Sequence, residues 1–340
     1  MKTAKKIAII SALIFIVAGM TLFITGCALL NFNFEEISTV KYTTNTHKIT
    51  EDFSSIDIDI AVADVAFIVS DNGESRVECY ESEKRYHTVA VEGNTLTVRE
   101  HKDFNIFHFI NLDFKKPRVT LYLSRTKFDA LKISSDTSLI VVPTEFSFKK
   151  CNISNHTGDV KYTAPTSGEL NIKTTTGRIM VSDIAPESIS LAASTGNVTL
   201  TSAKASGNVC IATSTGKIYL RDIECQDLSV TSSTGNKDIA GIKCKNLSSA
   251  SSTGRSVFED VIAGGVIKAE AGTGDVKFER CDAAELFIKT DTGDVEGTLL
   301  SDKIFLTQTD TGRISVPKST TGGRCEIETD TGDITMSIVK

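Results

Sequence analysis

The chain has 340 residues, of which 40% are hydrophobic and 24% are charged, a composition typical of a folded protein rather than a disordered one. Its 37 Lys and Arg residues are outnumbered by 43 Asp and Glu residues, and the formal net charge is −6. The sequence therefore lacks the basic surface that nucleic-acid binding requires. Tryptophan is absent and aromatic residues make up only 7%, so any binding surface must be built from other side chains.

The first 30 residues form a membrane anchor or signal segment. Lys2, Lys5 and Lys6 precede an apolar run from Ile7 to Leu30. As a helix this run is about 36 Å long, enough to cross a hydrocarbon core of about 30 Å. The lysines favour a cytoplasmic N-terminus. We expect a single-pass membrane protein that contacts the membrane through Ile7 to Leu30 and has its C-terminal domain outside.

A lipoprotein is the alternative interpretation of this segment. Residues Ile24 to Cys27 resemble the bacterial lipobox, in which the Cys is lipid-modified and becomes the new N-terminus. The apolar run continues past Cys27 through Ala28, Leu29 and Leu30, which favours an uncleaved anchor. An anchor, a lipoprotein and a simple secreted signal would all export the remaining chain.

Residues 31–136 are predicted to form an N-terminal β cap with degenerate coils. Alternating apolar residues at 56–69 indicate strands, and 89–98 is typical of a hairpin that turns at Glu92-Gly93-Asn94. Further strands are expected around Leu121 and Ile133. The least regular part runs from His101 to Lys116 and contains Phe104, Phe107, Phe109 and Phe114.

Residues 137–340 carry an internal repeat of Thr-Gly pairs. The pairs recur every 19 or 20 residues, which indicates that one structural unit is copied ten times. We expect each glycine to form a corner at positive φ, which glycine adopts most easily. The corner glycines are Gly158, Gly177, Gly196, Gly216, Gly235, Gly254, Gly274, Gly293, Gly312 and Gly332.

Apolar residues occupy fixed positions relative to each corner glycine. The residues seven and five positions before it, such as Leu170 and Ile172, are apolar in most repeats, as is the residue two positions after it. Lys237 and Ser256 are exceptions at the last of these positions. Apolar residues two apart on both sides of a turn are typical of β-strands.

A single unit of about 19 residues cannot bury its own apolar face, but stacked units can bury their apolar faces against one another. The sequence therefore predicts an all-β fold, a parallel β-solenoid of about ten coils spaced about 4.8 Å apart. A right-handed β-helix follows from the usual handedness of parallel crossovers.

The run of Thr-Gly corners behind a membrane segment resembles the bacterial putative-adhesin family. The resemblance covers roughly residues 37–340 and comes from the repeat rather than from any single motif. It implies a surface-exposed β-solenoid of unassigned function, in some cases associated with envelope-stress systems.

Three consecutive Asp-Thr-Gly triplets match the aspartic protease motif. Such a protease needs two facing carboxylates, whereas Asp291, Asp310 and Asp330 lie on successive copies of one corner, where other repeats have serine. We interpret them as corner residues on a solvated acidic edge. A calcium ion bridging the three aspartates is the alternative.

The cysteines after Cys27 fall mostly on inward positions of the repeat, where a thiol behaves as a small hydrophobic side chain. Cys225 and Cys244 lie in adjacent coils and could form a disulfide. There is no Cys-x-x-Cys pair, and the five histidines show no metal-binding spacing. The sequence predicts no catalytic residue, no cofactor and no metal.

These observations favour a non-catalytic cell-envelope surface module, structural or adhesive, whose partner is an unknown envelope protein or surface ligand. A regulatory or sensory partner of an envelope-stress system is the alternative. A β-helix enzyme acting on polysaccharide is disfavoured, because no cluster of acidic and basic residues marks one sheet.

The end of the chain leads to one more expectation. The sequence stops in the strand after the tenth corner, so the last coil is predicted to have an uncovered edge. Open strand edges recruit other strands unless charges prevent it. We expect end-to-end self-association through this C-terminal coil, limited by Glu326 and Glu328.

Overall fold

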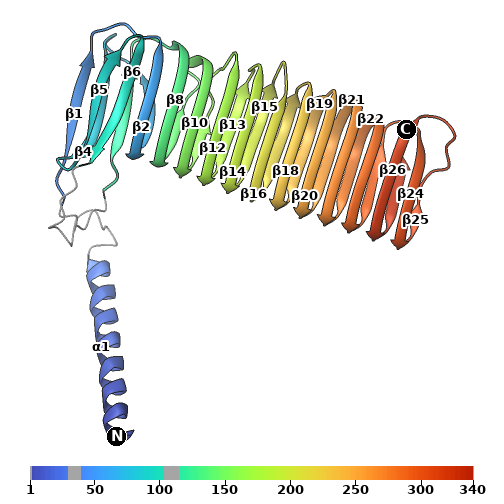
Figure 1. Cartoon of the computed structure of the whole chain (residues 1–340), viewed down its shortest axis with the longest axis horizontal. Helices are drawn as coiled ribbons and strands as arrows, with labels where there is room; N and C mark the ends of the chain where they lie inside the picture. Colours follow the sequence, from blue (N-terminus) through green and yellow to red (C-terminus); the bar gives the residue numbers. More distant parts are fainter. Residues whose placement is uncertain (1, 30–39, 103–114, 340) are drawn as a thin grey trace.

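The computed structural model describes residues 2–29, 40–102 and 115–339, which form one helix and a long stack of parallel strands (Figure 1). Helix α1 spans Lys2–Leu29 without a break. Within it, the hydroxyls of Thr21 and Thr25 donate to backbone carbonyls one turn earlier, at 2.8 Å, so these polar groups are satisfied inside the helix. The segment Ile10–Leu29 is long and apolar enough to cross a membrane, and a signal sequence has the same properties.

The predicted parallel β-solenoid is confirmed. Each regular coil has one strand before the Thr-Gly corner and one after it, and equivalent residues of successive coils pair in parallel, as Ile189 does with Val209. The strands before the corner are β8 (Lys127–Thr137), β10 (Ser147–Thr157), β12 (Glu169–Thr176), β14 (Ser188–Thr195), β16 (Val209–Thr215), β18 (Asp227–Thr234) and β20 (Asn246–Thr253). The strands after it are β9 (Ile140–Val142), β11 (Val160–Tyr162), β13 (Ile179–Ile184), β15 (Val198–Lys204), β17 (Ile218–Glu224) and β19 (Lys237–Cys244).

Two long strands, β21 (Ser256–Thr273) and β22 (Val276–Thr292), run from one corner to the next. The predicted apolar positions point into the rod: Leu170 and Ile172 are each 1% exposed. Aromatic rings also align between coils, since Phe258 and Phe278 are paired residues whose ring centroids lie 4.8 Å apart. The core is thus a set of continuous columns of like side chains.

The corner glycines are required for two reasons. Nine of the ten have positive φ, from Gly158 at 120° to Gly332 at 155°, as expected. In addition, a Cβ on Gly216 would lie 2.0 Å from the carbonyl oxygen of Gly196 in the coil beneath. Gly312 lacks the positive φ but has the same close approach, 2.0 Å from the carbonyl oxygen of Gly332. Coil-to-coil contact at the backbone therefore excludes a side chain here.

The N-terminal cap continues the stack. Strands β2 (Ser55–Val62) and β3 (Asp64–Val69) pair in parallel with β8 and β9, so regular stacking begins well before residue 137. Strands β6 (Thr95–Lys102) and β7 (Arg118–Leu123) lie in parallel on the other side of β2 and β3. The predicted hairpin is confirmed, with β5 (Arg85–Glu92) antiparallel to β6. Strands β1 (Tyr42–Ile49) and β4 (Ser75–Ser82) complete the cap with antiparallel pairs. The phenylalanine-rich stretch lies outside the described residues.

The far end of the rod corrects one prediction. Strand β26 (Gly323–Thr331) lies between β22 and β24 (Lys303–Thr311), and β27 (Ile334–Ile338) lies between β23 (Val295–Leu299) and β25 (Ile314–Ser315) (Figure 1). The last coil of the chain is therefore covered on both sides, so the prediction that it has an uncovered edge was wrong. The outermost strands are β24 and β25, and any contact made by this end would use them.

Burial explains this order of coils. The inserted coil carries Cys325, Ile327 and Ile334, each at most 1% exposed, whereas the outer coil presents Thr307 at an equivalent inward position and leaves Leu306 49% exposed. Placing the more apolar coil inside removes more apolar surface from water.

Candidate functional site

A shallow groove runs along the rod beside the Thr-Gly corners, over strands β10 to β22. We call it the corner groove. It has a volume of about 850 Å³ and passes eight corners, from Gly158 to Gly293, so at about 4.8 Å per coil it is roughly 34 Å long. Its central part is lined by small residues two or four positions before each corner glycine: Ala192, Ser194, Ala212, Ser214, Thr231, Ser233, Ala250 and Ser252.

Three buried oxygen atoms in the corner groove have no hydrogen-bond partner among the described residues; one is Ser251 Oγ. The other two are Asn155 Oδ1 and Ser232 Oγ, on residues that are 2% and 6% exposed. At the position equivalent to Ser232, the hydroxyl of Thr213 donates to the carbonyl oxygen of Gly196 at 3.1 Å. Because buried polar atoms are nearly always paired, these three atoms indicate sites that a ligand or water would satisfy.

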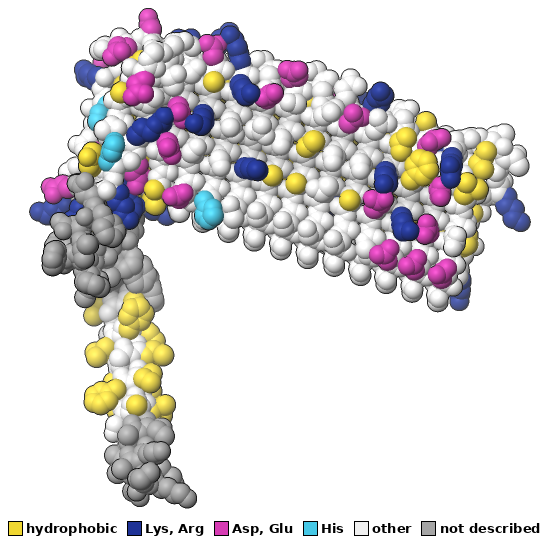
Figure 2. Space-filling model, in the orientation of Figure 1, with side chains coloured by type: hydrophobic (Ala, Val, Ile, Leu, Met, Phe, Trp, Pro, Cys, Tyr) yellow, Lys and Arg dark blue, Asp and Glu magenta, His cyan; other side chains and the backbone are white. Residues whose placement is uncertain are grey.

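The corner groove continues onto the cap. A second cavity of about 480 Å³ shares Ser154 and Asn155 with it and is also lined by Arg99, Glu100 and Lys102. On the face drawn in Figure 2, the central coils are largely free of charged side chains, which gather over the cap and the C-terminal coils. The corner groove itself ends in charged residues, with Lys173 at one end and Asp291 at the other.

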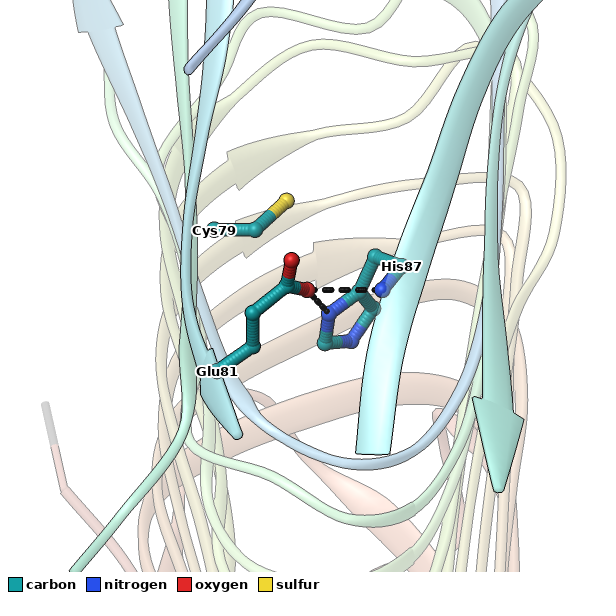
Figure 3. Close-up of side chains that lie close together, drawn as sticks. All are labelled: Cys79, Glu81 and His87. Carbon is teal, nitrogen blue, oxygen red and sulfur yellow. Dashed lines mark hydrogen bonds and ion pairs between the residues drawn. The ribbon is translucent and has the colours of Figure 1, made fainter. Parts of the chain in front are cut away.

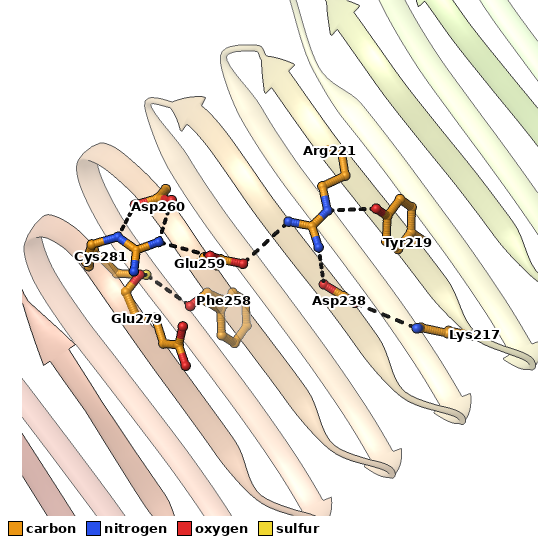
Figure 4. A network of polar contacts seen from close by, with 10 residues as sticks. Lys217, Tyr219, Arg221, Asp238, Phe258, Glu259, Asp260, Glu279 and Cys281 are labelled. Carbon is orange, nitrogen blue, oxygen red and sulfur yellow. Dashed lines mark hydrogen bonds and ion pairs between the residues drawn. The ribbon is translucent and has the colours of Figure 1, made fainter.

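A network of ion pairs lies on the strands that follow the corner, on β17, β19, β21 and β22 (Figure 4). Arg221 contacts Asp238 and Glu259 at 3.4 Å each, and Arg280 contacts Glu259 at 2.9 Å and Asp260 at 2.7 Å. The hydrogen bonds from Arg280 hold the pKa of the Asp260 carboxyl below its ordinary value. The expectation that no cluster of acidic and basic residues marks one sheet was therefore wrong. These charges satisfy one another across coils, which indicates a stabilising role rather than a binding site.

The three corner aspartates do not stack in chain order. Because of the inserted coil, Asp330 lies between Asp291 and Asp310. Lys289 donates a hydrogen bond to Glu328 at 2.9 Å, which is the main cause of its raised pKa, and the charges of Asp330 and Asp291 add to the effect. Within the ranges that the structure describes, the three carboxylates do not form a group close enough to hold a metal ion. The calcium ladder and the solvated acidic edge both stay predictions.

The cap contains a buried cluster of Cys79, Glu81 and His87, whose potential ligand atoms all lie within 4.8 Å of one another (Figure 3). Cys79 and Glu81 are two residues apart on β4 and so share one face, and His87 faces them from β5. All three are at most 2% exposed. Glu81 Oε2 lies 2.7 Å from His87 Nδ1 and accepts the backbone N–H of His87 at 2.6 Å.

The cluster is not arranged for nucleophilic catalysis. Burial and the nearby Glu81 raise the pKa of the Cys79 thiol to about 12, so the thiol stays protonated at neutral pH. Cys79 is 0% exposed and lines neither the corner groove nor the cap cavity. Its residue types are instead those of a transition-metal site.

The remaining cysteines are mostly packing residues. Burial raises the pKa of Cys151 and Cys325 to about 12, as expected for inert thiols in a core. All eight cysteines are free thiols, so the structure contains no bridge between Cys225 and Cys244.

Sequence reasoning missed both the corner groove and the cap cluster. The corner groove is lined by small residues at outward positions, and this pattern was present in the repeat. The pattern alone does not show that these residues line a concavity, which depends on the shape of the folded coil. The cap cluster had a weaker signal, the Cys-x-Glu alternation at Cys79 and Glu81, and required the pairing of β4 with β5 to bring in His87.

Comparison with solved structures finds similar proteins at low identity. A putative adhesin from Parabacteroides distasonis ATCC 8503 is 17% identical with a TM-score of 0.45, covering 86% of this chain and 98% of its own. A putative adhesin from Parabacteroides merdae ATCC 43184 is 14% identical with a TM-score of 0.42, covering 76% and 97%. A putative lipid binding protein from P. distasonis ATCC 8503 is 15% identical with a TM-score of 0.39, covering 88% and 98%. No curated protein matches the chain.

The family profile described as Toastrack DUF4097 matches residues 53–218 and again residues 212–340. The two matches together take in the cap from β2 onwards and the whole stack of coils. The expected resemblance is confirmed, and the chain belongs to the Toastrack DUF4097 family.

Proposed function

We propose that this protein is a membrane-anchored, non-catalytic surface rod that binds a linear polysaccharide along the corner groove. The observation that carries the proposal is the groove itself, a concavity roughly 34 Å long that is lined by hydroxyl and methyl groups in register. A small molecule would fill only part of it. A chain of repeating units matches a surface whose own units repeat.

The lining favours an uncharged, hydroxylated ligand. Serine and threonine hydroxyls both donate and accept hydrogen bonds, and the alanines between them leave room for sugar rings. Asn155 Oδ1, Ser232 Oγ and Ser251 Oγ add three buried acceptors that have no partner among the described residues. The central part of the groove has no basic residue to attract a phosphate backbone.

An extended peptide fits less well. Peptides bind β structures by adding a strand to an open edge. Along the corner groove the strands already pair with both neighbours, as β16 does with β14 and β18, so no backbone groups are free there. Side-chain hydroxyls would be the main partners of any ligand.

We expect neutral linear oligosaccharides to bind the full chain in detergent, with an affinity that rises with length until the oligosaccharide spans the corner groove. Ala212→Arg should weaken binding at least about tenfold, because the new side chain fills the centre of the floor. Isothermal titration calorimetry with oligosaccharides of increasing length measures both effects.

Thr199→Arg is the matched control, since it adds the same charge outside the groove, on β15 after the corner. It should leave the affinity unchanged. Absence of binding to every oligosaccharide, or equal losses in the two arginine variants, would rule out the groove as the polysaccharide site.

The proposal also places the rod outside the membrane on an uncleaved helix. Its support is the continuous helix α1, which runs through Cys27 to Leu29 and satisfies its own hydroxyls. In a lipoprotein, by contrast, the chain would be cleaved just before Cys27.

Cys27→Ala is expected to leave the protein in the membrane fraction after alkaline extraction and to leave its mass unchanged apart from the substitution. The wild-type protein should take up no label from a fatty-acid analogue. Labelling that disappears in Cys27→Ala, together with accumulation of the unprocessed chain, would show instead that Cys27 is acylated.

A further inference from the structure

We propose that Cys79, Glu81 and His87 bind a zinc ion in the cap, with Glu100 positioning His87. The three ligand atoms would be Cys79 Sγ, a carboxylate oxygen of Glu81 and His87 Nδ1, which already lie within 4.8 Å of one another (Figure 3). Thiolate, imidazole and carboxylate are the three ligand types that zinc takes from proteins. This site is independent of the corner groove.

The geometry needs little adjustment to accept the ion. Cys79 and Glu81 project from the same face of β4, and the two-residue turn of the β4–β5 hairpin, where Ser82 pairs with Arg85, brings His87 opposite them. Glu81 Oε2 and His87 Nδ1 are 2.7 Å apart, and a bound zinc ion would replace this direct contact by bonds to both atoms. The other oxygen, Glu81 Oε1, is already oriented by the side-chain amide of Asn45, which donates to it at 2.6 Å.

The second ring nitrogen of His87 supplies independent support. His87 Nε2 is buried and has no hydrogen-bond partner among the described residues, and it faces Glu100 Oε2 at 3.9 Å. A metal-bound histidine typically donates its other N–H to a carboxylate, which fixes the ring. Glu100 is itself held by the backbone N–H groups of Ala61 and Val62, at 2.7 and 2.8 Å.

Charge balance favours a divalent cation as well. Glu100 pairs with Arg85 at 3.0 Å, whereas Glu81 has no Lys or Arg ion-pair partner among the described residues. A buried carboxylate without a counter-charge is costly. Zinc bound to one thiolate and one carboxylate gives a neutral group, with the thiol proton of Cys79 released on binding. A protonated His87 is the competing way to balance Glu81.

The position of the site suggests what the ion would do. It would tie β4 to β5 in the hairpin that closes the N-terminal end of the rod, and metal sites that close a loop stabilise the folded state. Glu100 also lines the cap cavity of about 480 Å³, whereas the three ligand residues do not.

The test is a metal titration of the full chain in detergent after treatment with a chelator. We expect one zinc ion per chain, and Co²⁺ in its place should show the absorption of a thiolate-bound tetrahedral ion. Cys79→Ser and His87→Gln should each remove this binding. Glu100→Gln should retain the stoichiometry but weaken the affinity by about 10- to 100-fold, as expected for a positioning residue.

Cys210→Ser is the matched control, because Cys210 is the exposed thiol most available to adventitious metal, and it should change nothing. Circular dichroism of each variant tests whether it is folded, and Glu81→Gln provides a further ligand variant if Cys79→Ser does not fold. A zinc content near zero in the folded chain, or binding that persists without Cys79 and His87, would overturn the proposal and favour a protonated His87.

Discussion

Replacing Gly216 by alanine is expected to lower the free energy of unfolding by about 2 to 5 kcal/mol. Gly216 has a φ of 151°, and a Cβ at this residue would lie 2.0 Å from the carbonyl oxygen of Gly196. The unfavourable backbone conformation costs about 1 to 2 kcal/mol, and forcing an extra carbon into packed structure typically costs about 1 to 3 kcal/mol. The neighbour is backbone, so it cannot move aside without separating two coils.

Gly264→Ala is the control in the same solenoid. Gly264 has no positive φ, and the nearest atom to its added Cβ is the carbonyl oxygen of Cys244 at 4.0 Å. Urea and thermal unfolding of both variants measure the difference. Equal stability of the two variants would show that the corners tolerate a side chain, and the account of why glycine recurs in every repeat would fail.

Much of the fold could be predicted because one repeat constrains every copy. Once the Thr-Gly interval is known, the inward positions follow from strand alternation, and residues such as Ile172 and Ile211 are buried as expected. The cap hairpin was also predictable, since Gly93 supplies a turn at positive φ between two alternating runs.

A second corner, present in six of the coils, was not predictable. Six residues after the Thr-Gly glycine, the chain again adopts positive φ, at Ser202 (53°) and Arg280 (51°), for example. Only one repeat marks the position with glycine, at Gly241. Three other repeats have aspartate there, which tolerates positive φ, but Ser202 and Arg280 accept a less favourable conformation that tertiary stacking imposes, so propensity gives only a weak signal.

The order of the last coils could not be read from the sequence either. The repeat interval is the same whether a coil is added at the end or inserted beneath the previous one, and only the greater burial of Cys325 and Ile327 distinguishes the two arrangements. The cap cluster could not be predicted from the sequence either, because His87 comes from a different strand than Cys79 and Glu81.

One exception to the inward columns has a large energetic consequence. Lys237 occupies the apolar position two residues after Gly235, between Ile218 and Ser256 in the adjacent coils, and is 1% exposed. Its Nζ has no hydrogen-bond partner among the described residues. Burial lowers the pKa of Lys237 from 10.5 to about 8. At about 1.4 kcal/mol per pKa unit, the charged form costs the fold about 3 kcal/mol.

The pH dependence follows from the lowered pKa. Below pH 8 both the folded and the unfolded chain bind the proton, and the folded chain bears the whole cost. Between pH 8 and 10.5 the unfolded chain still binds the proton that the folded chain has released, so stability rises with pH. Above pH 10.5 Lys237 is neutral in both states, so its burial no longer costs the fold this free energy. When the pH is lowered again, this gain in stability is lost as the pH falls through 8.

Lys237→Met is therefore expected to raise the free energy of unfolding at pH 7 by about 3 kcal/mol, because methionine fills a similar volume without charge. The variant should also lose the rise in stability between pH 8 and 10.5 that this lysine contributes. Lys161→Met, at an exposed position on β11, should change stability little at any pH. Urea unfolding of the three proteins from pH 7 to 10.5 measures both effects. If Lys237→Met is less stable than the wild type, then the ammonium is paired in the folded chain, for instance through a buried water.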